Sequence, residues 1–459
     1  MTATPTKDAA HAGARVTWVT VAVSVLFTVL PLVVFLPGDR MTREIVLAVA
    51  AALVAAYVAS VHPFAIFGAF AAVLGFIPYL HVPSTSVPLL LVLSVGVWVA
   101  LAFLPGVRFH PGAPELWLLA LVATALLSAV ATGMSGTTIK ELAAWVAATA
   151  IVVPVRFLPA AARATTVRVF VLSAAAASVL GIVLVRIDPF GVLLERLTIA
   201  GYREGRTNVQ RVPGTADIAT RLTGTFVEPN IAGLVLGAGL LLAVAYFRGP
   251  IRVALVVVIG AGLLLTLSRA AIATAAVAGV LLVLRTPGRQ RITLVASGLV
   301  AGLGALAIPS VQARLLDSFG PSDTGTRARD LAFQEFPRAM QGHWVWGLGW
   351  DRDEFRMASL GRVINYVANG PLVTIYRGGV VLGILVVVVL LVLVVRSWFA
   401  ARRSFEDAVV CCGVIGIVLV ALQLDFPIVI QAPATALFSF LVGLSLAPHP
   451  PDPPGASRA

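Results

Sequence analysis

The chain has 459 residues, of which 59% are hydrophobic and only 12% are charged, and its formal net charge is +12. Soluble domains carry about 25% charged residues, so this composition excludes an ordinary soluble enzyme and indicates many membrane-spanning helices. The positive charge comes from arginines spread over many short segments without a basic run, which favours a lipid bilayer as partner and argues against nucleic acid.

Apolar segments long enough to cross a bilayer recur along the whole chain, since a spanning helix needs about 20 residues. They predict an all-α polytopic membrane protein with about 12–14 transmembrane helices and a large extracytoplasmic loop. The expected spans are 16–36, 45–60, 63–80, 88–105, 115–133, 141–157, 168–187, 229–247, 251–267, 270–285, 292–309, 371–395, 407–424 and 427–446.

These spans divide the chain into regions and suggest its orientation. We expect a cytoplasmic N-terminus (1–15), an N-terminal bundle (16–187), an outer loop (188–228), a second group of helices (229–309), a large extracytoplasmic loop (310–370), C-terminal helices (371–446) and a disordered Pro-rich tail (447–459). Short-loop arginines mark the cytoplasmic side of a membrane protein. Those that we expect on that side are Arg156, Arg163, Arg168, Arg248, Arg252, Arg285, Arg289, Arg291, Arg396, Arg402 and Arg403.

Two polar segments lie where spans are expected to begin. Ser268 and Arg269 interrupt the apolar run 251–285. An arginine at membrane depth costs about 2.5 kcal/mol or more, unless it reaches the interface or binds an anion with its planar fork. In the other segment, Glu228 and Asn230 flank Pro229, where they either cap the next helix or line the mouth of a substrate cavity together with Arg221.

The segment 310–370 is too long, polar and aromatic for a simple connection, so we expect it to have a function. Its tryptophans, including Trp350, suit either the interfacial belt or stacking on sugar rings, and Tyr366 precedes the re-entry into the membrane. Phe333, Phe336 and Met340 are spaced to share the apolar face of a helix on the outer leaflet. Adjacent Cys411 and Cys412 are interpreted as packing residues.

Five short motifs, in this order, resemble those of the O-antigen ligase/polymerase superfamily of bacterial cell-envelope glycan enzymes. They lie in the part of the chain from about 220 to 395 and are individually short. They are Gly224-Thr-Phe226-Val-Glu-Pro229-Asn230, Ser268-Arg269-Ala270, Gly325-Thr-Arg327, Gly347-Leu-Gly349 and Asn369-Gly-Pro-Leu372 with Gly378-Gly379 after it.

The resemblance implies a GT-C-like multi-pass enzyme of the bacterial cytoplasmic membrane, active on its extracytoplasmic face and without a metal or other cofactor. It would move glycan from a polyprenyl diphosphate carrier to a hydroxyl of a glycan, lipid or protein acceptor. On this resemblance Arg269, Arg327 and Asn369 are the expected catalytic residues, with the first two holding the diphosphate. The expected substrate-binding residues are Arg221, Glu228, Asn230, Ser268, Trp350 and Tyr366.

One position departs from the family pattern, because Ala368 stands where relatives have a histidine that is thought to act as base. The base therefore stays open among Glu228, Asp351, His343 and Tyr366. Other functions also stay open: a polysaccharide polymerase of the same superfamily, a transporter or flippase of lipid-linked glycan, and an inactive lipid-binding relative.

Overall fold

The structure of the protein is a computed structural model. It describes residues 57–82, 87–104, 107, 112–188, 193, 221–286, 288–307, 311–312, 333–351, 355–356, 363–364, 369–421 and 431–448. The expected span 16–36, most of the span 45–60, most of both predicted outer loops and the C-terminal tail lie outside these residues.

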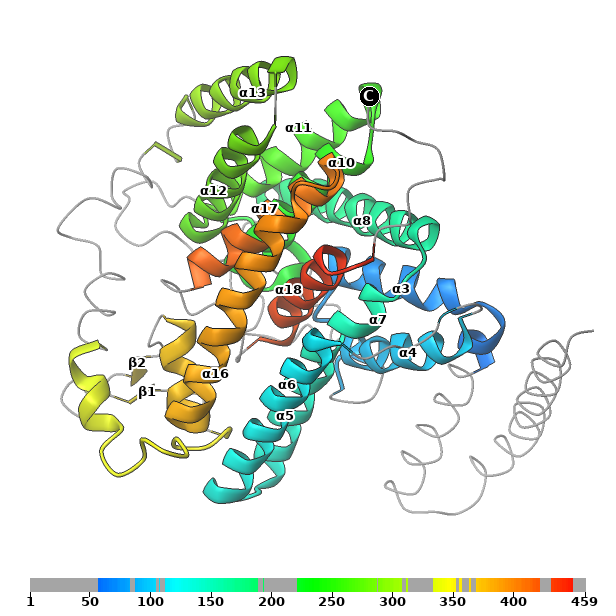
Figure 1. Cartoon of the computed structure of the whole chain (residues 1–459). Helices are drawn as coiled ribbons and strands as arrows, with labels where there is room; N and C mark the ends of the chain where they lie inside the picture. Colours follow the sequence, from blue (N-terminus) through cyan, green and yellow to red (C-terminus); the bar gives the residue numbers. More distant parts are fainter. Residues whose placement is uncertain are drawn as a thin grey trace, which may run out of the picture.

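Helices make up almost all of the described chain (Figure 1). The helices are α3 Pro63–Phe76, α4 Leu89–Phe103, α5 Ala113–Thr132, α6 Gly136–Ala150, α7 Val152–Arg156, α8 Ala160–Ile187, the 3₁₀ helix η2 Gly224–Phe226, α10 Pro229–Tyr246, α11 Gly249–Leu265, α12 Arg269–Arg285, α13 Gly288–Leu306, α16 Gly370–Ala400, α17 Phe405–Ala421 and α18 Ala432–Ser445. Two-residue strands, β1 Phe355–Arg356 and β2 Val363–Ile364, pair antiparallel.

Five of the described helical segments are long and apolar enough to cross a membrane: α5, the continuous stretch α6–α7, α8, α10 and α16. Four more, α3, α4, α11 and α18, are apolar but shorter. Side chains that face outward from these helices are largely hydrophobic, such as Leu119 on α5 and Leu391 on α16. The chain is therefore an all-α membrane protein, as its composition predicts.

Most observed boundaries agree with the expected spans to within five residues, and the observed starts of α8 and α18 change the positions assigned to individual polar residues. Helix α8 begins at Ala160 rather than 168, because the Ala-rich residues before 168 favour a helix, so Arg163 and Arg168 lie on the helix and not in a loop. Helix α18 begins at Ala432 rather than 427. Gln431 is its N-cap residue and has extended backbone angles. Both corrections change the residue at which a helix begins, and neither changes which segments are helical.

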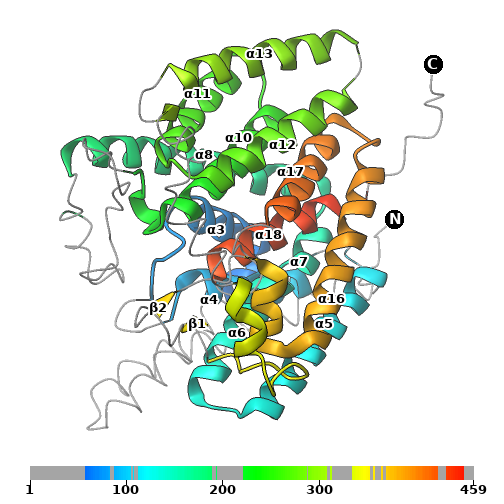
Figure 2. The same cartoon turned by 90° about the vertical axis from the view of Figure 1, so that its left-hand side faces the viewer.

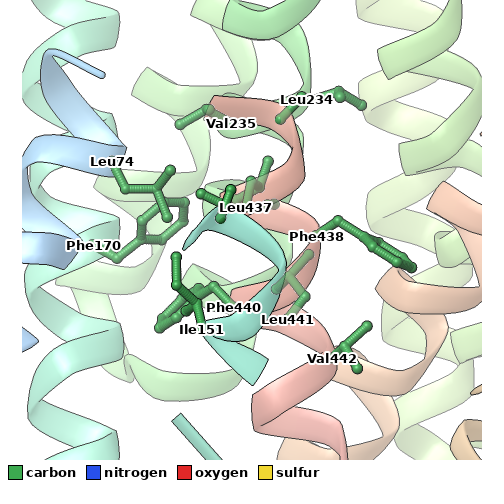
Figure 3. Close-up of a cluster of buried hydrophobic side chains, with 14 of the residues drawn as sticks. Leu74, Ile151, Phe170, Leu234, Val235, Leu437, Phe438, Phe440, Leu441 and Val442 are labelled. Atoms are coloured by element: carbon green, nitrogen blue, oxygen red, sulfur yellow. The ribbon is translucent and has the colours of Figure 1, made fainter. Parts of the chain in front are cut away.

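Helix α18 occupies the centre of the core. Residues 433–445 are all buried, with neighbours from α3, α6, α7, α10, α16 and α17 around them. Figure 3 shows Phe440 and Leu437 of α18 among Leu74 of α3, Phe170 of α8 and Val235 of α10. The rings of Phe170 and Phe440 are 5.5 Å apart. A helix surrounded on all sides has no polar face, which explains why its sequence is largely apolar and carries no charged residue.

Helix α16 is interrupted near its start. Gly379 has φ 84° and ψ 171°, which no helical residue adopts. The Gly-rich segment 344–349 fills the interruption with backbone hydrogen bonds: Val380 N donates to Trp344 O (2.8 Å) and Leu348 N donates to Tyr376 O (2.7 Å). This pairing fixes part of the predicted outer loop against the helix, as Figure 2 shows for the yellow segment beside α16.

The helices run back and forth, so polar residues gather at two opposite ends of the bundle. One end carries the starts of α10, α12, α16 and α18. The other end is rich in arginine, and there Arg285 lies over the ring of Trp398, 3.2 Å from its centroid, and donates from Nη2 to Trp398 O (3.1 Å). The arginines at or near this second end are Arg156, Arg163, Arg248, Arg285, Arg396, Arg402 and Arg403.

Candidate functional site

A hydrogen-bonded group of polar side chains, here called the polar cluster, consists of Arg221, Glu228, Asn230, Ser268 and Gln431. The buried Arg221 donates from Nε to the Thr266 carbonyl (2.9 Å) and from Nη2 to Asn230 Oδ1 (3.1 Å). Ser268 donates from Oγ to the same Asn230 oxygen (3.0 Å). The structure thus joins two motifs that are 38 residues apart in the sequence, 221–230 and 268–270.

Glu228 is held through both oxygens of its carboxylate. Oε1 accepts from Asn230 Nδ2 (3.2 Å) and Oε2 accepts from Gln431 Nε2 (2.6 Å). Although Glu228 occupies the N-cap position of α10, its side chain makes no capping hydrogen bond, so the expectation that it caps this helix is wrong. The carboxylate instead connects the start of α10 to the start of α18, and it is only partly buried.

Two residues with left-handed backbone lie beside the polar cluster. Val227 has φ 61° and Leu267 has φ 50°, and neither is a glycine. Such conformations cost about 1–3 kcal/mol each and persist only where the surrounding structure enforces them. Leu222 N donates to Leu265 O (2.9 Å), which holds the 221–228 segment against the end of α11. Backbone strain on both sides of one polar group is typical of a functional site.

The electrostatics of the polar cluster favour an anion. The hydrogen bonds Ser268–Asn230 and Gln431–Glu228 bring together the starts of α10, α12 and α18, and each helix start carries about half a positive charge. Arg221 adds a full positive charge, and Arg269, half-buried, is the first residue of α12. A cation at a helix start is unfavourable by itself. Among the described residues Glu228 is the single carboxylate of the polar cluster, and the helix starts together with Arg221 and Arg269 place positive charge around it.

The structure places the other predicted site residues as follows. Asn369 precedes α16, and its Oδ1 accepts from Leu372 N (3.1 Å), so it caps that helix. Arg327 and Tyr366 lie outside the described residues, as does Ala368. Among the remaining candidates for the base, Asp351 is exposed and its Oδ2 accepts from Ser135 Oγ at 3.4 Å, and His343 is exposed in a turn.

Trp350 does not lie in an interfacial belt. Its side chain is fully buried and packs on Trp145 of α6, with ring centroids 5.2 Å apart. Its indole nitrogen is buried and has no hydrogen-bond partner among the described residues. Trp344 and Trp346, by contrast, are 42% and 45% exposed, as interfacial side chains are expected to be.

The helical segment 333–339 also differs from expectation. Phe336 and Met340 are buried in the core, and Phe336 meets the edge of Trp344 at 6.0 Å, whereas Phe333 is exposed. The three residues therefore do not form one lipid-facing stripe, because Phe336 packs against Trp344 of the Gly-rich segment and Met340 is also buried. Cys411 and Cys412 are buried and free, as packing residues should be.

Gln431 is the member of the polar cluster that was not predicted, because it was expected inside the span 427–446. The sequence carried a signal for it. Pro433 is the second residue of α18, and proline in the first turn is a normal sign of a helix start. That start puts Gln431 at a helix end beside the other polar residues and not at membrane depth.

Comparison with models of known protein families finds no match for this chain, and none of the curated proteins matches it either.

Proposed function

We propose that the chain is a membrane glycan transferase of the O-antigen ligase or polymerase type, which moves glycan from a polyprenyl diphosphate to an acceptor hydroxyl. The polar cluster supports this function best. It combines three helix starts and Arg221, with Arg269 beside it, which suit a diphosphate, and one partly exposed carboxylate, which suits proton transfer.

The reaction that this arrangement favours is a displacement at the anomeric carbon of the donor sugar. The acceptor oxygen forms a bond to that carbon as the bond from the carbon to the diphosphate oxygen breaks, and the diphosphate leaves with the electron pair. Arg269 and the helix starts stabilise the negative charge that develops on the leaving group. Glu228 takes the hydroxyl proton, since each of its oxygens accepts one hydrogen bond from the described residues and so retains a lone pair.

The distribution of charge along the helices supports an orientation with the polar cluster outside. The arginine-rich end of the bundle lies opposite the polar cluster, and arginines in short loops mark the cytoplasmic side. In this orientation the protein is a multi-pass, GT-C-like protein of the bacterial cytoplasmic membrane, with 12–14 spans and its large loop and active face outside.

The orientation has a direct test in a variant without Cys411 and Cys412. A cysteine replacing Gln341, which is exposed in the turn that precedes the Gly-rich segment, should react with an impermeant thiol reagent in intact spheroplasts. A cysteine replacing Gln290, exposed at the start of α13 at the opposite end of the bundle, should react only after lysis. The reverse pattern would place the polar cluster in the cytoplasm and contradict an envelope enzyme.

The activity itself is tested with purified protein in vesicles and a labelled polyprenyl-diphosphate glycan. Transfer of the label to an acceptor supports the proposal. Movement of the intact lipid across the vesicle, or binding without either event, identifies a flippase or an inactive lipid-binding relative instead.

Arg269 should be sensitive to small changes in this assay. Lysine keeps the charge but loses the two-pronged contact with phosphate oxygens, so Arg269→Lys should lower turnover about tenfold, and Arg269→Ala about a hundredfold or more. Arg327→Lys and Arg327→Ala are expected to follow the same order. Arg338 is exposed on the 333–339 helix, and Arg338→Ala should leave turnover within about twofold of wild type. If the variants at all three positions keep wild-type turnover, Arg269 does not bind the diphosphate and serves only to anchor its helix at the membrane interface.

One observation favours a transporter as the second candidate. Discontinuous membrane helices bind cargo in many transporters, and α16 is interrupted at Gly379 with the fully buried Arg377 beside the break. The vesicle assay separates this function from transfer, because a flippase moves the lipid without forming a new glycosidic bond.

A further inference from the structure

A groove that the proposed transfer does not use lies between α5, α6, α16 and α18. Helices α5 and α16 pack against each other, as α6 and α18 do. The groove has about 820 Å³ of space free of protein atoms, and part of this space is open to the surroundings. Most of its lining side chains are apolar, such as Leu118 of α5 and Val389 and Leu393 of α16, and none belongs to the polar cluster. A concave apolar surface with a few polar groups is the usual form of a ligand site.

The charge in this groove is confined to one end. Among the described residues that line it, only Arg396, near the end of α16, is charged. The Arg396 side chain is exposed, and no carboxylate in the described ranges pairs with it. Glu115, which follows the lining residue Pro114 in the first turn of α5, already pairs with Arg156. The arginine-rich end of the groove therefore offers a positive charge to a ligand.

The opposite end of the groove is enclosed. The lining residues farthest from Arg396 on their helices are Leu121, Trp145, Val386 and Thr435, and all four are buried. Trp145 packs in turn on the ring of Trp350, with centroids 5.2 Å apart. A lipid chain that enters near Arg396 would therefore end at this tryptophan pair.

The length of the groove matches one leaflet of a bilayer. Val386 and Arg396 are ten residues apart, and a helix rises about 1.5 Å per residue, so the groove extends about 15 Å along α16. The hydrocarbon core of a bilayer is about 30 Å thick, and each leaflet supplies half of it. An acyl chain whose headgroup lies at Arg396 thus has the length to fill the groove.

We infer that this groove binds one anionic glycerophospholipid from the leaflet at the arginine-rich end, which is the cytoplasmic leaflet in the proposed orientation. An acyl chain lies between α5 and α16, and the phosphate contacts Arg396, whose planar guanidinium can donate two hydrogen bonds to phosphate oxygens. A polyprenyl diphosphate with its charged group in the polar cluster fits this groove less well, because its apolar tail would then end at the charge of Arg396.

The test uses the full-length protein, purified in detergent and washed free of phospholipid. Dioleoyl phosphatidylglycerol, dioleoyl phosphatidylcholine and a polyprenyl phosphate are added separately and in competition. Bound lipid is counted by native mass spectrometry, and the midpoint of thermal unfolding is followed as lipid is added, since a ligand that binds the folded state raises it.

Two pairs of variants separate the headgroup contact from the chain contact. Arg396→Gln removes the charge at the groove, and Arg252→Gln removes an exposed arginine at the start of α11, at the same end of the bundle. Leu393→Trp fills the groove, whereas Leu391→Trp changes a side chain that is 59% exposed and does not line it.

The wild type should bind one phosphatidylglycerol, at least about threefold more tightly than phosphatidylcholine, because anionic headgroups favour a basic site. Arg396→Gln should weaken phosphatidylglycerol binding about tenfold and abolish this preference, as expected for loss of a charged hydrogen-bond donor. Leu393→Trp should weaken the binding of both phospholipids about tenfold or more by occupying the chain site. Arg252→Gln and Leu391→Trp should stay within about twofold of wild type.

The inference is wrong if the washed wild type binds neither phospholipid, or if Arg396→Gln and Arg252→Gln bind phosphatidylglycerol equally well. It is also wrong if the polyprenyl phosphate displaces phosphatidylglycerol from the wild type, because the groove would then hold the donor chain. Should Leu393→Trp not fold, the exposed position of Arg396 keeps the first pair of variants decisive. Glycan transfer does not enter these measurements, so this inference holds or fails independently of the proposed transferase.

Discussion

Glu228→Gln should lower the turnover of glycan transfer about a hundredfold or more while the donor still binds with near wild-type affinity. Removal of a general base costs about 10²–10⁴ in rate, and glutamine keeps the shape of the side chain. The fold should tolerate the change, because the Gln431 amide can rotate and offer its oxygen to the new amide nitrogen. Single-turnover kinetics and donor titration on the purified protein measure the two quantities separately.

Asp351→Asn is the control for this prediction, since Asp351 is the exposed carboxylate near Ser135 rather than a member of the polar cluster. It should retain turnover within about twofold of wild type. If Asp351→Asn loses activity and Glu228→Gln keeps it, the base lies in the Gly-rich part of the loop and the role assigned to Glu228 is wrong.

Gly379→Ala should have the largest effect on stability. A Cβ at this position would lie 1.9 Å from the carbonyl oxygen of Val345, and the φ of 84° is itself unfavourable for alanine. Neither the helix nor the Gly-rich segment can move without breaking the hydrogen bonds between them. We therefore expect a large loss of folded protein, measured as monodisperse yield in detergent and as the midpoint of thermal inactivation.

Gly279→Ala provides the comparison, because Gly279 lies inside α12 and a Cβ there meets no atom within 4 Å. Alanine favours a helix over glycine by up to about 1 kcal/mol, so this variant should be as stable as wild type or slightly more stable. Equal behaviour of the two variants would mean that the segment 344–349 does not pack into α16 in the membrane.

The sequence was sufficient to locate most of the described helices, because a long apolar run bounded by Pro, Gly and Arg forms a helix when it crosses a bilayer. The starts of α10, α11 and α12 agree with expectation to within two residues. The predicted start of a helix was wrong where the residues before it also favour a helix. Helix α8 is the example, because residues 160–167 contain no proline or glycine that would mark a later start.

The candidate site was predictable in part. Arg221, Glu228, Asn230 and Ser268 were recognised from their position at span starts, and the structure joins them through hydrogen bonds. Pro433 marks the helix start beside Gln431, but the hydrogen bond of Gln431 to Glu228 was not predictable, because a contact between residues 203 positions apart leaves no local pattern. The burial of Trp350 was missed for a related reason: an aromatic side chain suits a membrane interface and a core equally well, and only its neighbour Trp145 decides between them.

The central position of α18 has a consequence for how the protein is made. The ribosome delivers this helix after all the other described helices, yet its side chains fill the middle of the bundle, and Gln431, which precedes it, completes the polar cluster. The described helices made earlier must therefore leave an open slot in the membrane until α18 is made. Among the described helices, α18 closes the bundle from the inside, and the polar cluster is complete only after its insertion.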